Sequence, residues 1–177
     1  MDMNYKTING FSSRILTEMN GLGKTWFTLS DVSSLFPDMS ENGIRVGAKR
    51  MCDSGLLLLV REGAYYVVPF EQDSRTYLPD WHLLAEPLAI GDHYIGYYSA
   101  LQIHGLTTQP ALKEQIVVNR QRKPSKTYVN GTCFQLIYHN DRHFFGHEKA
   151  RINQNDQVYC SSVEKPIIDC LYLSISI

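Results

Sequence analysis

The sequence predicts an α+β protein of two domains. Hydrophobic residues recur at helical spacing near the N-terminus, whereas β-rich runs dominate from residue 114 onward. Between these regions, the polar segment 70–80 contains Pro79 and shows no hydrophobic period. We therefore place the domain boundary at Ser74, which gives a first domain at 1–74 and a second at 75–177. A chain of 177 residues is long enough to build a core in each.

The composition limits the classes of partner. The chain is 44% hydrophobic and 20% charged, as in ordinary soluble globular proteins. Its net charge of −1 means that any affinity for nucleic acid has to come from local basic patches. The four cysteines are widely spaced, which is typical of reduced thiols rather than of disulfides or a zinc site. No apolar run has the length of a membrane span, and we expect a cytoplasmic protein.

Three helices are expected in the first domain. Residues Phe11–Leu22 place their apolar side chains on one face. A second helix has a cap signal at Ser30 and stops before Pro37, which cannot continue the hydrogen-bond ladder. Ser40 caps the third helix, and Gly55 ends it. The buried stripe of this third helix is Ile44, Ala48 and Met51.

The opposite face of the third helix is polar and cationic. Arginine can pair bidentately with guanine, asparagine can do the same with adenine, and lysine offers a point charge to phosphate. Two short strands, Leu56–Val60 and Ala64–Val68, follow and are joined by Arg61-Glu62-Gly63. Three helices and a hairpin in this order predict a winged helix-turn-helix domain. Its expected DNA-contacting residues are Ser40, Asn42, Arg45, Val46, Lys49, Arg50 and Arg61.

Two alternatives apply to this domain. The cations could simply solvate an outer helix face, which is what most charge runs do. A winged helix can also dock proteins rather than DNA. The tripeptide Gly23-Lys24-Thr25 does not indicate a phosphate-binding loop, because Glu18 stands where that motif needs glycine and a helix precedes it.

The second domain is predicted to be mixed α/β. Helices are expected at Asp80–Ala89 and Ile95–His104. A final helix is expected after the capping box Ser161–Glu164. Strands are expected at Glu114–Asn119, Thr132–Tyr138, His143–His147 and Gln157–Cys160, the second and third forming a hairpin around Asn140-Asp141.

The second domain offers one candidate binding segment. Four cations without an acid lie in the loop 119–126 and predict a phosphate-binding surface: Arg120, Arg122, Lys123 and Lys126. Solvation of a hairpin loop is the alternative. His139, His143 and His147 would be spread along strands, about 13 Å per four residues, which is too far for a shared metal. We predict no cofactor, no metal site and no catalytic nucleophile or carboxylate cluster.

Three segments resemble the AbiEi-type antitoxin family, the regulators of bacterial abortive-infection toxin–antitoxin systems. Ser99-Ala100-Leu101 with His104-Gly105-Leu106-Thr107 is similar to the family's "SAL…HGLT" segment. The hairpin "GLL…REGAYYVVP" at 55–69 resembles the end of its N-terminal domain. The "EK…I-D" pattern at 164–169 resembles its later helix. Together these segments span most of the chain in the family's order.

This resemblance implies a non-enzymatic protein, a monomer or weak dimer. The first domain would bind inverted repeats in double-stranded promoter DNA and repress a two-gene operon. The second would counteract a nucleotidyltransferase-like toxin without requiring direct contact, as in type IV systems. Family members continue where this chain stops at Ile177, so the resemblance implies a shortened C-terminal domain. The alternative hypotheses are a nuclease-related second domain, or one that only binds a protein partner.

Overall fold

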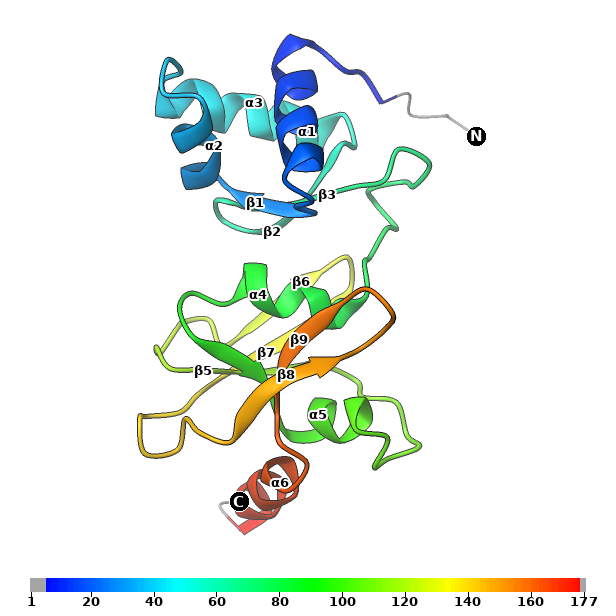
Figure 1. Cartoon of the computed structure of the whole chain (residues 1–177), viewed down its shortest axis with the longest axis vertical. Helices are drawn as coiled ribbons and strands as arrows, with labels where there is room; N and C mark the ends of the chain where they lie inside the picture. Colours follow the sequence, from blue (N-terminus) through cyan, green and yellow to red (C-terminus); the bar gives the residue numbers. More distant parts are fainter. Residues whose placement is uncertain (1–5, 176–177) are drawn as a thin grey trace. The chain divides into compact units, whose positions relative to one another are not determined.

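The computed structural model describes residues 6–175 and is of mixed α+β class. It divides into two units, Met1–Leu78 and Pro79–Ile177 (Figure 1). The division follows Leu78, slightly beyond the boundary expected at Ser74. Within the described part of the chain, no helix combines the length and apolar character needed to cross a membrane.

Among its described residues, the first unit contains three helices and a three-stranded antiparallel sheet. Their order along the chain is α1 (Gly10–Gly21), β1 (Trp26–Thr28), α2 (Leu29–Leu35), α3 (Glu41–Asp53), β2 (Leu57–Arg61) and β3 (Ala64–Val67). The sheet order is β1-β3-β2, so the last strand lies in the middle. The helices and the hairpin were predicted, but strand β1 was not.

Caps define the helix ends of this unit. Ser40 caps α3 as predicted, because its hydroxyl accepts the Gly43 N–H at 3.1 Å. The predicted cap at Ser30 is wrong. Thr28 caps α2 instead, in a reciprocal box with Asp31, three residues further on. Gly55 has a φ of +75°, a conformation that glycine adopts without strain, and so ends α3 as predicted.

The core of the first unit joins all three helices to the sheet. Phe27 of β1 and Val32 of α2 are fully buried, as is Ile15 of α1. Helix α3 contributes Ile44, Ala48 and Met51, the predicted stripe. Where α1 meets α3, the Phe11 ring lies where a Cβ on Gly47 would stand, so this packing of Phe11 on α3 depends on glycine.

The second unit is built on a six-stranded mixed sheet of order β6-β7-β5-β4-β9-β8. Its strands are β4 (His93–Ile95), β5 (Glu114–Val118), β6 (Lys126–Val129), β7 (Thr132–Tyr138), β8 (His147–Arg151) and β9 (Gln157–Ser161). Its helical segments are η1 (Trp81–Leu84), α4 (Ala85–Leu88), α5 (Tyr97–Ile103) and α6 (Lys165–Ile175). The pairs β5–β7 and β4–β9 are parallel, and the other pairs are antiparallel.

Helical segments cover both faces of this sheet, α4 on one and α5 on the other, and α6 packs on α5 (Figure 1). Two neighbouring residues of β5 show that its side chains point alternately to the two faces. Glu114 bonds to His82 of η1, whereas the Gln115 side chain accepts the Tyr98 N–H of α5 at 3.0 Å. Successive side chains of a strand point to opposite faces, so β5 is buried on both.

Three predictions for this unit are wrong. Strand β7 pairs with β5 and β6, and β8 begins only at His147 and pairs with β9, so there is no hairpin around Asn140-Asp141. The helix expected at Ile95–His104 is present as α5, and only its predicted start is wrong, because strand β4 ends at Ile95. The capping box is absent as well, because Ser161 is the buried last residue of β9 and α6 begins at Lys165.

Candidate functional site

The predicted DNA-contacting face of α3 is exposed. Ile44, Ala48 and Met51 are at most 2% exposed and hold the helix on the core. The opposite face presents Asn42, Arg45, Val46, Lys49 and Arg50, all exposed. The structure therefore brings these five side chains together on one helix surface. Ser40 stands at the start of the same helix, with its hydroxyl committed to the cap.

The tip of the β2–β3 hairpin carries a negative charge. The turn itself is Glu62-Gly63, and Arg61 is the last residue of β2 rather than part of the turn. Arg61 is half-buried, and its guanidinium donates to the carbonyl of Glu62 at 3.1 Å. The Glu62 carboxylate lies 3.8 Å from the Arg45 guanidinium of α3. The pairing of Glu62 with Arg45 was not predicted.

An apolar groove lies between α3 and the hairpin. Its volume is about 660 Å³. Arg45, Val46 and Lys49 form its helical side, while Leu59 and Tyr65 belong to the strands. Leu59 is 52% exposed although it lies within β2. The predicted DNA-contacting face therefore borders an open apolar surface, which the strand pattern could have revealed because leucine occupies four successive positions at 56–59.

The basic loop of the second unit has two kinds of cation. The Arg122 guanidinium donates to the Leu88 carbonyl at 2.7 Å, so this side chain ties the loop to the end of α4. Arg120, Lys123 and Lys126 are exposed. A free cationic surface is therefore limited to these three side chains of the predicted set.

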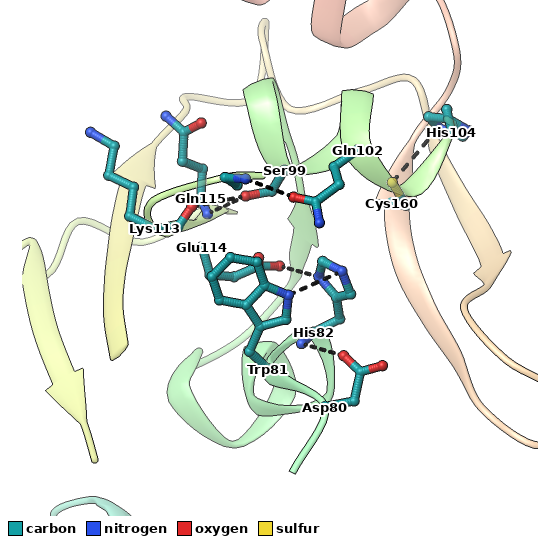
Figure 2. Close-up of polar contacts among 11 residues, drawn as sticks. Asp80, Trp81, His82, Ser99, Gln102, His104, Lys113, Glu114, Gln115 and Cys160 are labelled. Atoms are coloured by element: carbon teal, nitrogen blue, oxygen red, sulfur yellow. Dashed lines mark hydrogen bonds and ion pairs between the residues drawn. The ribbon is translucent and has the colours of Figure 1, made fainter. Parts of the chain in front are cut away.

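A buried acid–histidine pair connects η1 to the sheet (Figure 2). Glu114 is fully buried, and its Oε1 lies 2.9 Å from Nδ1 of His82. The Trp81 indole N–H donates to Nε2 of His82 at 3.2 Å. Because that nitrogen accepts, we assign the proton of a neutral imidazole to Nδ1, which then donates to Glu114. The second carboxylate oxygen, Oε2, is buried with no hydrogen-bond partner.

Cys160 of β9 contacts His104 and is held as a thiol. Its Sγ is 3.7 Å from Nε2 of His104, whose N–H donates to the Ser161 carbonyl at 2.7 Å (Figure 2). Burial, together with the nearby charge of Glu114, raises the pKa of the Cys160 thiol to about 12. A thiol with this pKa is not ionised at neutral pH, which disfavours a nucleophilic role.

The three histidines predicted to be spread along a hairpin are instead gathered near Tyr94. The His147 ring stacks on Tyr94 at 4.7 Å, and the His139 and His143 rings are 6.3 Å apart. Nδ1 of His139 donates to the His143 carbonyl at 3.1 Å, so its Nε2 accepts the Tyr97 hydroxyl at 2.6 Å. No group of three metal-binding side chains occurs in the described residues.

Two further features near His139 were not predicted. Lys165 and Asp169 of α6 form a buried ion pair at 2.7 Å, for which their i, i+4 spacing was the available signal. Tyr97 begins α5 with a φ of +53°, a conformation that non-glycine residues rarely adopt. In this conformation its phenol reaches Nε2 of His139.

The fold and these surfaces define an α+β protein of two units, with an exposed cationic helix in the first. No protein-family model matches the chain, and no curated protein matches it either.

Proposed function

We propose that the first unit is a winged helix-turn-helix domain and that the protein is a DNA-binding transcriptional repressor. The order of helices and strands supports this domain type, because α2 and α3 follow one another through a short turn and a β-hairpin follows α3. In helix-turn-helix domains the second of two such helices enters the major groove. Here that helix is α3.

The observation that carries the proposal is the division of α3 into two faces. Its buried stripe fixes the helix, so that Arg45, Lys49 and Arg50 remain exposed beside Asn42 and Val46. Arginine and asparagine make the bidentate base contacts, lysine pairs with phosphate, and valine offers an apolar contact to the thymine methyl group. Arg61 would contact the sugar-phosphate backbone beside the hairpin.

The role in the cell is proposed from the sequence resemblance. The repressor would act on inverted repeats in its own promoter. The second unit would serve as the antitoxin that counteracts a nucleotidyltransferase-like toxin of a type IV system in the cytoplasm. Its exposed cations Arg120, Lys123 and Lys126 would add a positive surface to that unit.

Fluorescence anisotropy with the chain's own upstream DNA and a scrambled duplex, at two salt concentrations, tests DNA reading. We expect tighter binding of the upstream duplex, with a preference that persists at the higher salt. Co-expression with the neighbouring gene then tests toxin rescue. Equal and salt-sensitive binding of both duplexes would reject sequence-specific reading.

A protein-docking module is the second candidate function. It is favoured by the apolar groove between α3 and the hairpin, since Leu59 and Val46 are 52% and 41% exposed there. Co-purification of a stable complex that Leu59→Lys abolishes, without specific DNA binding by the unmodified chain, would support this candidate.

A further inference from the structure

A cleft on the second unit is lined by aromatic rings and carboxylates. Its volume is about 530 Å³. It lies where α4, the start of β4 and strand β9 meet the segment that leads into β8. The lining residues are Glu86, Gly91, Asp92, His93, Phe144, His147 and Tyr159. None of the functions proposed above uses this cleft.

The aromatic walls are packed against one another. The Tyr159 ring meets His93 edge-on at 6.3 Å and His147 at 6.4 Å. Phe144 packs on His147 at 5.0 Å, and His147 is stacked on the fully buried Tyr94. These contacts fix the rings against one another, while Tyr159 remains 45% exposed and available to a ligand.

The residues that line the cleft carry negative charge, whereas Arg120 lies beside it next to Gly91 and Lys149 lies near Tyr159. Glu86 and Asp92 are exposed acids, and no lysine or arginine is among the described residues that line it. Asp92 accepts the Asn119 amide N–H at 3.0 Å, which orients its carboxylate. Burial lowers the pKa of His93 despite nearby acids, so its ring is neutral at neutral pH. A phosphate or carboxylate ligand would be repelled by these two acids.

The chain's own Lys149 side chain already makes a cation–π contact with the Tyr159 ring of the cleft. The Lys149 ammonium lies 5.6 Å from the centroid of Tyr159. Lys149 lines a smaller adjoining cleft of about 160 Å³, which shares Glu86, His93 and Tyr159 with the larger one. Cations are attracted to the faces of aromatic rings, and proteins use such rings to bind ammonium ligands.

We propose that this cleft binds an organic cation, an alkylammonium or guanidinium group, between the aromatic walls and the carboxylates of Glu86 and Asp92. Tyr159 supplies the ring face, and Glu86 supplies the counter-charge from α4. Lys149 competes for the same ring and weakens binding. The cation is either that of a free amine or that of a lysine or arginine side chain on a partner protein.

Nuclear magnetic resonance titration of the full chain tests this site. The probes are spermidine, as a free amine, and the peptide acetyl-Ala-Arg-Ala-amide, with its neutral citrulline analogue for comparison. We expect saturable shifts of the Tyr159, Phe144 and His93 ring signals with at least one cationic probe and none with citrulline. Saturation by spermidine alone identifies a free amine, and saturation by the peptide alone identifies a side chain.

Variants make the test specific. Glu86→Gln and Tyr159→Leu should each weaken binding by roughly tenfold, whereas Lys149→Gln should tighten it. The matched controls are Glu164→Gln and Tyr128→Leu, which change exposed residues that do not line the cleft. Any of three results would overturn the proposal. They are shifts with the citrulline peptide equal to those with the arginine peptide, no saturable shift with either cationic probe, and a loss of affinity in the control variants equal to that in Glu86→Gln and Tyr159→Leu. Because Glu86 is exposed, its variant stays informative even if Tyr159→Leu does not fold.

Discussion

Arg45 of α3 and Glu62 of the β2–β3 turn form an ion pair at 3.8 Å, and both side chains are largely exposed, 64% and 91%. An exposed pair of this kind contributes little to folding stability. If α3 binds DNA as proposed, the effect of the pair on that binding should be larger, because Glu62 pairs with Arg45 and places a negative charge at the β2–β3 turn, where the proposed domain would meet phosphate. We therefore expect the pair to lower the affinity of the first unit for any duplex.

Glu62→Gln should consequently bind DNA more tightly. We expect a gain of roughly threefold to tenfold at low salt, on the upstream and scrambled duplexes alike, and a steeper salt dependence. Anisotropy titrations at several salt concentrations measure both quantities. Glu18→Gln, an exposed acid on α1, is the matched control and should change neither. An unchanged affinity in Glu62→Gln would show that the turn does not approach the DNA.

Substitutions on α3 separate base reading from phosphate pairing. Arg45→Ala should cost about 1–3 kcal/mol on the upstream duplex and much less on the scrambled one, if Arg45 reads a base. Lys49→Ala should weaken both duplexes similarly and lower the salt slope by about 1. Arg75→Ala removes an exposed cation paired with Asp73 and serves as the control. Unchanged affinity in both α3 variants would exclude this helix as the reading element.

The contact between α1 and α3 predicts a sensitive glycine. In Gly47→Ala the new methyl group would overlap the Phe11 ring, so either the ring or the two helices would have to move. We expect a loss of about 1–3 kcal/mol in the free energy of unfolding, the usual cost of overpacking. Gly21→Ala in α1 is the control, since its added Cβ meets no atom within 4 Å. Urea unfolding of the two variants gives the comparison.

The elements of the first unit were predictable because their signals are local. Ile44, Ala48 and Met51 recur at helical spacing, and Ser40 and Gly55 stand at the two ends of α3. Strand β1 was missed because three residues, Trp26–Thr28, are too few to show a period. The cap at Thr28 had a readable signal, namely Asp31 three residues further on.

The second unit depends on pairings between distant segments, which no local pattern specifies. Asn130-Gly131 was the stronger hairpin signal and was overlooked; both residues have positive φ, 43° and 82°, as a two-residue turn requires. The DNA-contacting residues remain predictions. The Glu114–His82 pair could not be predicted, because 32 positions separate the two residues and only the packing of η1 on β5 joins them.

That buried pair has a testable energetic role. Glu114→Leu removes the acceptor and leaves the Nδ1–H of His82 buried without a partner, which should cost about 1–3 kcal/mol of stability. Glu114→Gln keeps an acceptor oxygen and removes the buried charge, so its loss should be smaller. Chemical denaturation of both variants measures the difference. A loss in Glu114→Gln equal to that in Glu114→Leu would show that the charge, rather than the hydrogen bond, stabilises the fold.

Two histidines predict how stability depends on pH. Burial is the main cause that lowers the pKa of His93 and of His139 below the ordinary value of 6.5. As the pH falls below 6.5, these histidines bind protons in the unfolded chain but not yet in the folded chain. The free energy of unfolding therefore decreases on acidification. The decrease stops once the pH is below the lowered pKa of the folded state. Each histidine contributes a slope of at most about 1.4 kcal/mol per pH unit.

His139→Gln tests the contribution of one ring. The substitution removes a titrating group whose Nε2 accepts the Tyr97 hydroxyl, a bond that protonation of that nitrogen would disrupt. Urea unfolding at pH 7.5 and pH 5.5 should show a smaller loss of stability on acidification in His139→Gln than in the unmodified chain. His143→Gln removes an exposed ring that is only the smallest of the causes lowering the pKa of His139, so it should change this loss much less and serves as the control. The same acid-induced loss in all three proteins would mean that His139 does not set this pH dependence.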